Sequence, residues 1–465
     1  MITETITIPD RRRWLALVVL SMGAFLSPLD YFIVNIALQA IKDTLHVNES
    51  ALQLVVAAYG LAYAALVVTG GRLGDIFGRK RVYMTGMLAF TAASAGCAMA
   101  PDIRFLIAVR AVQGAAAAML APQVLATIRV IFPSAEQPRA MGIFGAVFGV
   151  AAIAGQLLGG LLINAHIFGW TWESIFMINI PVGILTILGA AFILEENKPA
   201  KRPQLDIAGM LLVTLTLALF IFPLIKGREA GWPLWTFGCM ALAVITGILF
   251  LYTEQRVLHA GKDPLIHIPL LKGRHFRTGL GVIFLYNHTS AFFVVFPYYL
   301  QHALHWDALS AGLAVLPYAT GFFAGPLLSA RINGHEGVKT VKAGMLLLST
   351  GFLLSSCIIY LTAAPILFKC CLLMAGLGHG IVMPSMLRLV MGSAPLTFAG
   401  QASGIVSTAV QTGGVLGGAV LGTLFFTLSG FFSYQLSLVI TFAALAAVQA
   451  SGFLLAIIFG KQQTH

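Results

Sequence analysis

Long apolar segments recur along the whole chain, and this recurrence constrains the fold more than any other feature. A helix that crosses about 30 Å of hydrocarbon needs about 20 apolar residues. We count fourteen such segments, joined by short connections, in 465 residues. They are continuously apolar instead of alternating with polar residues, which excludes a transmembrane β-barrel. The expected spans are 14–40, 51–70, 82–100, 103–129, 139–164, 174–194, 205–225, 233–253, 277–302, 309–330, 340–361, 364–391, 400–428 and 436–459.

The composition supports a membrane protein. Hydrophobic residues make up 58% of the chain and charged residues only 10%, whereas soluble domains carry about 25% charged residues. The apolar run after Arg11, Arg12 and Arg13 is too long for a secretory signal, so we interpret it as a retained first helix. We therefore expect an all-α polytopic protein of the cell membrane, whose loops are too short for a soluble catalytic domain.

The net charge of +11 is explained by topology and not by nucleic acid. With both termini in the cytoplasm, 22 of the 28 lysines and arginines lie at the cytoplasmic side. That distribution obeys the positive-inside rule, and an even number of spans agrees with it. We expect no nucleic-acid partner.

Sliding the chain by 259 residues matches two distant regions of it. Tyr59 then falls on Tyr318 and Arg72 on Arg331, while Gly155 falls on Gly414. Two matches at one offset suggest two homologous halves, and halves related by an axis along the membrane normal place a site near the midplane, as in transporters that work by alternating access. The expected organisation is a cytoplasmic tail over 1–13, a six-helix bundle over 14–194, a linker with two extra helices and a basic loop over 195–276, a second six-helix bundle over 277–459, and a cytoplasmic tail over 460–465.

One acidic residue, Asp30, lies well inside an apolar span. An ionised carboxylate at the bilayer centre costs about 2.5–3.5 kcal/mol, so a functional role is the default reading. Burial disfavours the charged form, which makes Asp30 a candidate for exchanging a proton during transport. The alternative is a structural Asp30, locked by hydrogen bonds or by Arg110 of the fourth span. Arg110 itself either takes part in the coupling or extends to the membrane surface.

The connection between the second and third spans has a pattern of its own. Gly71, Gly74 and Gly78 permit a tight turn and a close approach of helices. Asp75 can interact with a helix N-terminus, and Arg79 begins a basic run that stays in the cytoplasm. We expect a gating loop here, and the simpler alternative is a turn that only sets topology.

These motifs together resemble those of the major facilitator superfamily. The 71–81 loop resembles its signature between helices 2 and 3, and Arg110–Gly114 is similar to its proton-linked motif of helix 4. The segments Leu29–Leu38 and Phe176–Gly183 resemble motifs of its fourteen-helix drug:proton antiporter family, the EmrB/QacA type. The resemblance covers about 14–460.

The resemblance implies two six-helix bundles plus two extra helices, and proton-driven multidrug efflux of the kind that gives antibiotic resistance. It also implies that Asp75 and Arg79 latch one arrangement of the halves and that Arg110 takes part in coupling. The helix-5 motif of that family usually carries Gly-Pro, whereas here Gly155 is followed by Gln156. Gln156 removes a proline kink and adds a polar group to the interior.

Polar residues within other apolar spans are candidates for the substrate cavity, because polar runs that face lipid are disfavoured. His288 either relays protons or is a hydrogen-bonded structural histidine, and His379 either lines the cavity or serves packing. Small residues mark close contacts between helices. The cavity candidates are Asn35, Gln113, Gln156, Asn287, His288, Phe292 and His379, and the packing candidates are Gly114, Gly155, Gly159 and Gly414.

The leading hypothesis is proton-coupled export of hydrophobic or amphipathic compounds by a monomer in the lipid bilayer, with protons and a small-molecule substrate as partners. The alternative is a dedicated exporter of a specific metabolite, lipid or organic anion. An intramembrane enzyme is excluded, because paired acids, HExxH and GxGD are missing from the sequence, and a receptor or scaffold would not need the coupling motifs. Five cysteines without CxxC spacing predict no metal site, and we expect no cofactor.

Overall fold

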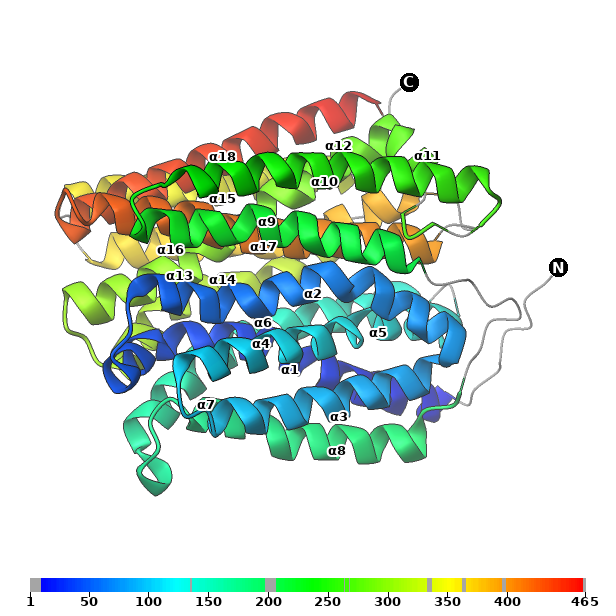
Figure 1. Ribbon diagram of the computed structural model, residues 1–465, viewed down its shortest axis with the longest axis horizontal. Helices are drawn as coiled ribbons and strands as arrows, with labels where there is room; N and C mark the ends of the chain where they lie inside the picture. The colour runs from blue at the N-terminus through cyan, green and yellow to red at the C-terminus, as the bar shows by residue number, and fades with distance from the viewer. Residues whose placement is uncertain are drawn as a thin grey trace.

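The computed structural model describes residues 10–133, 136–196, 206–262, 264–266, 268–332, 337–361, 365–394 and 399–462. Every regular element in these ranges is a helix. The long helices run side by side along one direction (Figure 1). This architecture confirms the expected all-α membrane fold.

Thirteen helices in the described ranges are long and apolar enough to cross a membrane. The remaining expected span corresponds to α3, whose first residues Arg79, Lys80 and Arg81 lower its mean hydropathy. Figure 1 shows α3 running beside α8, within the bundle. The elements of this first part are α1 (Asp10–Leu45), α2 (Glu49–Phe77), α3 (Arg79–Ala98), α4 (Ile103–Ala118), α5 (Ala121–Ile131), α6 (Gln137–Ala165), a 3-10 turn (Ile167–Gly169), α7 (Ser174–Met177) and α8 (Asn179–Ile193).

Two further helices follow before the second part of the bundle. They are α9 (Ile207–Glu229) and α10 (Leu234–His259), which pack on each other. The last part contains α11 (Ile268–Lys272), α12 (Arg274–Asn287), α13 (Ser290–Tyr298), a π-helical turn (Tyr299–Ala303), α14 (Ala308–Ile332), α15 (Gly337–Tyr360), α16 (Pro365–Gly392), α17 (Ala399–Leu428) and α18 (Tyr434–Gln462).

Two pairs of helices make most of the contact between the first and last parts of the chain. α6 packs along α14, and α2 packs along α17. α9 lies against both α2 and α17, so the extra pair covers one of these two seams (Figure 1). The domain boundaries expected from the sequence stay a prediction.

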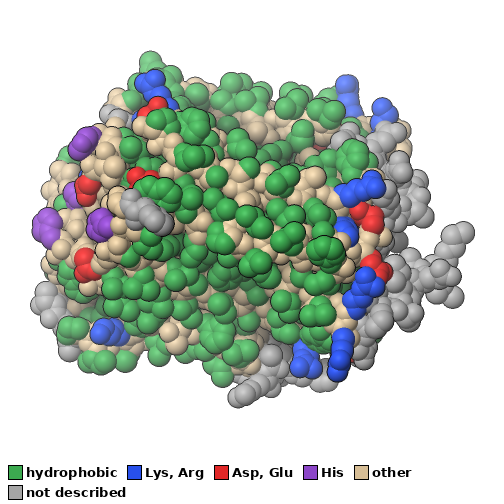
Figure 2. Space-filling view, turned by 90° about the horizontal axis from the view of Figure 1, so that it is seen from below, with side chains coloured by type: hydrophobic (Ala, Val, Ile, Leu, Met, Phe, Trp, Pro, Cys, Tyr) green, Lys and Arg blue, Asp and Glu red, His purple; other side chains and the backbone are tan. Residues whose placement is uncertain are grey.

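The surface is apolar around the middle of the bundle. Leu88, midway along α3, is 61% exposed, and Ile248, midway along α10, is 63% exposed, which would be costly in water and is natural in lipid. In Figure 2 most Lys and Arg side chains of the visible face lie at one end, and His side chains lie at the other. We call the first of these the basic end; α1 begins there and α18 ends there (Figure 1).

Candidate functional site

Two fully buried charged groups form an ion pair between α1 and α4. A guanidinium nitrogen of Arg110 donates to Oδ2 of Asp30, and both side chains are fully buried. The two residues are 80 positions apart in sequence. A buried ion pair is held only if further hydrogen bonds satisfy the remaining atoms.

Neutral donors supply those hydrogen bonds. Gln113 Nε2 donates to Asp30 Oδ1 at 2.8 Å, and Asn179 Nδ2 donates to the same oxygen at 3.0 Å. Ser94 Oγ receives a hydrogen bond from Gln113 Nε2 at 2.8 Å. Helices α1, α3, α4 and α8 thus converge on one carboxylate. We call Asp30, Ser94, Arg110, Gln113 and Asn179 the carboxylate cluster.

Two aromatic rings and a carbonyl flank the guanidinium. The Arg110 Cζ lies 4.4 Å from the centre of the Tyr59 ring and 5.7 Å from that of Phe176. Arg110 Nε donates to the Val55 carbonyl at 3.3 Å. These contacts between a cation and ring faces stabilise a charge removed from water. The arginine therefore keeps partners on α2 that are independent of Asp30.

The sequence pointed to Asp30 and Arg110 but assigned Gln113 to a substrate cavity, and it missed two members of the carboxylate cluster. The structure places Gln113 between the two charged residues, where Arg110 also donates to its carbonyl at 2.7 Å. Asn179 and Ser94 were not singled out as site residues. An isolated amide in the apolar run of α8 was the available signal for Asn179, whereas Ser94 carried none.

In the last part of the chain a histidine replaces the ion pair. His379 on α16 is 8% exposed. Its Nδ1 and the Tyr318 hydroxyl are 2.6 Å apart, and its carbonyl accepts a hydrogen bond from the Tyr286 hydroxyl at 2.8 Å. The imidazole stacks on Phe322 with ring centres 4.3 Å apart, and Phe292 stacks on Tyr318 at 4.5 Å. We call His379, Tyr286, Phe292, Tyr318 and Phe322 the aromatic cluster.

Three of the other cavity candidates bond within their own helices. Asn35 Nδ2 donates to the Tyr31 carbonyl at 2.8 Å, and Asn287 Nδ2 donates to the Ile283 carbonyl at 2.7 Å. His288 Nδ1 lies 2.9 Å from the Phe284 carbonyl. The structure therefore does not gather these side chains into one polar site in this conformation.

The contact between the two halves near these residues is aromatic and apolar. The rings of Phe32 and Phe293 are 4.5 Å apart across it. Gln156 is fully buried on the same side, with Nε2 3.5 Å from the Phe32 carbonyl. Their part in a substrate cavity stays a prediction.

Three of the four glycines predicted to mediate packing lie at close contacts. A Cβ at Gly114 would collide with the Tyr59 carbonyl, and at Gly155 and Gly159 it would lie 2.8 Å from Phe32 Cβ and 3.0 Å from Ile33 Cγ1. Gly414 differs, because the nearest atom is Ser290 Cβ at 3.9 Å, an ordinary contact.

The expected gating loop is a sharp turn between α2 and α3. Gly78 has φ +102°, a conformation that favours glycine, and a Cβ there would collide with Glu196. The Glu196 carboxylate accepts the backbone N–H groups of Lys80 at 3.2 Å and Arg81 at 3.3 Å. An acidic group at a helix N-terminus is stabilising, so Glu196 holds the start of α3.

Other predicted loop residues also meet neighbouring helices. Arg79 donates to the Ala126 carbonyl at 3.1 Å. A Cβ at Gly74 would collide with Gln123, while Gly71 has an ordinary contact with Pro122 at 3.5 Å. The side chain of Asp75 lies outside the described residues.

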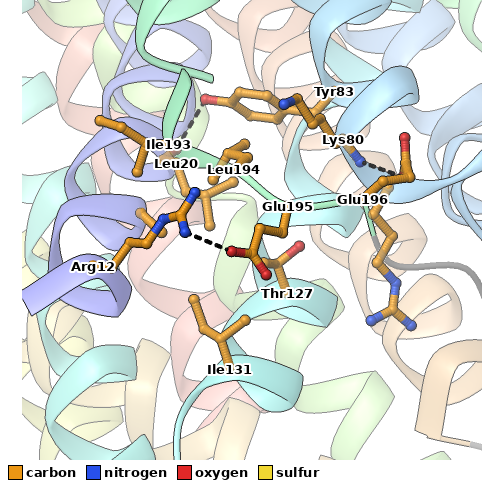
Figure 3. Close-up of a pocket in the computed structure, with 12 residues that line it drawn as sticks. Arg12, Leu20, Lys80, Tyr83, Thr127, Ile131, Ile193, Leu194, Glu195 and Glu196 are labelled. Atoms are coloured by element: carbon orange, nitrogen blue, oxygen red, sulfur yellow. Dashed lines mark hydrogen bonds and ion pairs between the residues drawn. The ribbon is translucent and has the colours of Figure 1, made fainter. Parts of the chain in front are cut away.

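A pocket opens beside this loop at the basic end (Figure 3). Its walls come from α1, α3, α5 and the end of α8, and Arg12 forms an ion pair with Glu195 at 2.9 Å. Tyr83 closes its inner side and donates to the Val19 carbonyl at 2.9 Å. All of these helices belong to the first part of the chain, so the pocket does not lie between the halves.

At the end opposite the basic end, polar contacts join the two halves. Lys42 Nζ binds the Glu49 carboxylate at 2.7 Å and the Tyr298 hydroxyl at 3.1 Å. Asn164 Nδ2 donates to Asp307 Oδ2 at 2.8 Å. Hydrogen bonds from Ser310 and Asn164 hold the pKa of the Asp307 carboxyl below its usual value. These contacts close this end of the seam between the halves.

A bundle of membrane-length helices with a buried ion pair at the convergence of four of them defines a polytopic membrane protein of transporter type. The sequence profile of the Major Facilitator Superfamily matches residues 20–418, and the chain belongs to that family. Its members are transporters, which agrees with the resemblance inferred from the motifs.

Curated relatives cover most of the chain. A probable actinorhodin transporter of Streptomyces coelicolor is 36% identical over 91% of this chain and 74% of its own length. The puromycin resistance protein pur8 of Streptomyces alboniger is 34% identical over 90% of this chain and 82% of its own length.

Among solved structures, the human organic anion transporter MFSD10 (TETRAN) has a TM-score of 0.66 at 16% identity, covering 97% of this chain and 100% of that one. A POT family transporter has a TM-score of 0.67 at 13% identity, covering 97% of each chain. At these identities the likeness shows the fold.

Proposed function

We propose that this protein is a proton-driven exporter of hydrophobic or amphipathic compounds. The observation that carries the proposal is the fully buried Asp30–Arg110 pair, whose carboxylate is surrounded by neutral donors. Structural needs alone do not explain such a pair, since a buried ion pair is weak evidence of stability. Curated relatives named for the transport of, or resistance to, single antibiotics support export.

Protonation of Asp30 is the proposed coupling step. A neutral carboxyl loses most of its attraction for Arg110. Arg110 then keeps the Tyr59 ring and the Val55 carbonyl of α2 as partners. The contact between α1 and α4 loosens while that between α4 and α2 persists, and this difference biases the rocking of the two halves. Deprotonation on the other side of the membrane restores the pair.

The aromatic cluster is the proposed wall of the substrate site. It presents Phe292, Tyr318 and His379 close to the Phe32–Phe293 contact between the halves. Opening of that contact would expose stacking surfaces together with the neighbouring amides of Asn35, Gln156 and Asn287. Flat apolar compounds with a few polar groups fit this chemistry.

We further propose that the basic end is cytoplasmic, so that both termini lie inside, and that the transporter acts as a monomer. The positive-inside rule supports this orientation. In it, the gating loop with Asp75 and Arg79 faces the cytoplasm, and the contacts of Lys42 and Asp307 close the external side.

A dedicated exporter of one compound is the second candidate. The observation in its favour is that the relatives above are named for single compounds, actinorhodin and puromycin. An organic anion as that compound would have to find a cation other than Arg110, because Asp30 already pairs with it. Competition among cationic, neutral and anionic dyes for transport separates a broad exporter from a dedicated one.

The test is transport in proteoliposomes with an imposed pH gradient, using ethidium, a neutral dye and an anionic dye as probes. We expect Asp30→Asn to abolish gradient-driven transport. Asp43→Asn is the matched control, because Asp43 lies exposed on the same helix. Full gradient-driven transport by a folded Asp30→Asn variant would overturn the proposal.

A further inference from the structure

A pair of acidic side chains lies at the basic end of the two extra helices. Asp206 immediately precedes α9, and its Oδ1 accepts the backbone N–H of Gly209 at 2.8 Å. Glu254 lies near the end of α10 and is fully buried. Its Oε2 accepts the backbone N–H of Ile266 at 2.7 Å. One oxygen of each carboxyl therefore accepts a hydrogen bond from a backbone N–H group.

The two remaining oxygens lie beside the same glycine. Glu254 Oε1 and Asp206 Oδ2 are both buried and have no hydrogen-bond partner among the residues that the structure describes. Both oxygens crowd the Cα of Gly209: a Cβ there would lie 2.8 Å from Asp206 Oδ2 and would collide with Glu254 Oε1. A hydrogen bond between these two oxygens needs a proton, because ionised carboxylates only accept.

Among the residues that the structure describes, the cations on neighbouring elements form no ion pair with these carboxyls. On α2, Arg72 is directed to the Pro264 carbonyl. On α10 the Arg256 guanidinium lies over the Tyr252 ring, with Cζ 4.5 Å from its centre. Within the described residues, Lys272 of α11 forms no ion pair with either carboxyl. Two adjacent buried carboxylates cannot both ionise without a cation.

We infer that Asp206 and Glu254 share one proton and form a proton-binding site separate from Asp30. Its ligand is a proton exchanged at the basic end of the extra helix pair. No covalent step is involved: the proton bridges Glu254 Oε1 and Asp206 Oδ2, and its loss leaves two adjacent carboxylates.

Backbone contacts connect this site to the gating region. Glu254 accepts a hydrogen bond from the Ile266 backbone N–H. Two residues before Ile266, the Pro264 carbonyl accepts a hydrogen bond from Arg72 Nη2 at 2.6 Å. Arg72 lies on α2 between Gly71 and Gly74. An ionised carboxylate accepts a hydrogen bond more strongly than a neutral carboxyl, so proton loss tightens the bond from Ile266 and with it the 264–266 segment that anchors Arg72. Proton loss therefore fastens the extra helices to α2, and its effect on transport rests on the proposed function.

Infrared difference spectroscopy of the purified full chain tests the shared proton without any substrate. We expect a pH-titratable band of a protonated carboxyl in the wild type and its loss in Glu254→Gln. Asp206→Asn, which leaves a different amide in the pair, should remove it as well. Asp30→Asn should retain this band, and so should Glu195→Gln, since Glu195 lies at the same end but pairs with Arg12. An unchanged band in both Glu254→Gln and Asp206→Asn overturns the inference.

Hydrogen–deuterium exchange tests the connection to the 264–266 segment. After correction for intrinsic exchange, protection of the Ile266 amide should rise about tenfold as the pair loses its proton at high pH, because a hydrogen bond to a charged acceptor is stronger than one to a neutral acceptor. Glu254→Gln should make that protection independent of pH. Equal pH dependence in wild type and Glu254→Gln contradicts the link. The transport test with Asp30→Asn bears only on the proposed function. Its outcome leaves the exchange result at Ile266 unchanged.

Discussion

Tyr59 and Tyr318 occupy corresponding places in the two halves, yet the polar side chains beside them differ in charge. The carbonyl of Tyr59 faces Gly114 and its ring lies against Arg110. The carbonyl of Tyr318 faces Gly376, and its hydroxyl meets His379. The same backbone approach thus supports an ion pair in the first half and an aromatic cluster around a histidine in the second. The difference suggests a division of labour, with proton exchange on one side and substrate contact on the other.

Removing the cation of the first half should have the largest effect. Arg110→Gln leaves Asp30 buried without a counter-charge, which costs about 3–5 kcal/mol in the free energy of unfolding. Thermal unfolding in detergent measures this, and gradient-driven transport should be lost together with stability. Arg104→Gln is the matched control, since Arg104 is exposed on the same helix. Equal stability of the two variants would remove the basis of the comparison.

Removing a neutral hydrogen-bond donor should lower stability by a smaller amount, and the loss should differ between the two halves. Asn179→Leu deletes a hydrogen bond to a carboxylate, worth about 1.5–3 kcal/mol. Asn287→Leu deletes a bond to a carbonyl of its own helix, worth about 1 kcal/mol. The shift in unfolding temperature compares the two, and gradient-driven transport should fall only for Asn179→Leu. A larger effect at Asn287 would reverse the assignment.

The corresponding tyrosines offer a more direct contrast. Tyr318→Phe removes the hydroxyl that meets His379, so the affinity for a transported dye should change by about fivefold, the effect of one hydrogen bond of about 1 kcal/mol. Gradient-driven transport should persist. Tyr59→Phe keeps its ring over Arg110 and should leave dye affinity unchanged. Binding measured by fluorescence anisotropy decides this, and an equal affinity change in both variants would count against a division of labour.

The smallest effect is expected at the closed end of the seam. Asp307→Asn weakens an exposed contact with Asn164, which changes transport by at most about fivefold. Because the folded-state pKa of Asp307 is lowered, its contribution is complete above the unfolded pKa and is lost only as the pH falls through the lower folded value. Transport rates of variant and wild type should therefore keep one ratio between pH 6 and pH 8. A ratio that varies in this window would show that Asp307 titrates there.

Much of the fold could be predicted because hydrocarbon thickness dictates segment length. The apolar segments, the turn at Gly78 and the lone deep Asp30 all follow from that constraint and from backbone sterics. Pairing of Asp30 with Arg110 was one of two readings of the sequence, and the structure places the two in contact.

Contacts between distant helices could not be predicted. Nothing in the sequence around Ser94 or His379 states which helix faces them. Glu254 falls just after the expected span 233–253, and only the packing of α9 on α10 brings it and Asp206 to the same glycine. The predicted cavity residues do not form one site for the same reason. Spacing within one helix shows which residues share a face, but it does not show which helix packs against that face.

Proton release on substrate binding tests the central claim most directly. Purified protein in weakly buffered detergent solution is mixed with a transported dye, and the released protons are counted with a pH indicator. At a pH at which Asp30 is protonated before the dye is added, we predict up to one released proton per bound dye in the wild type, and none from Asp30→Asn while the dye still binds. The same release from both proteins would place the exchanged proton elsewhere and contradict the account.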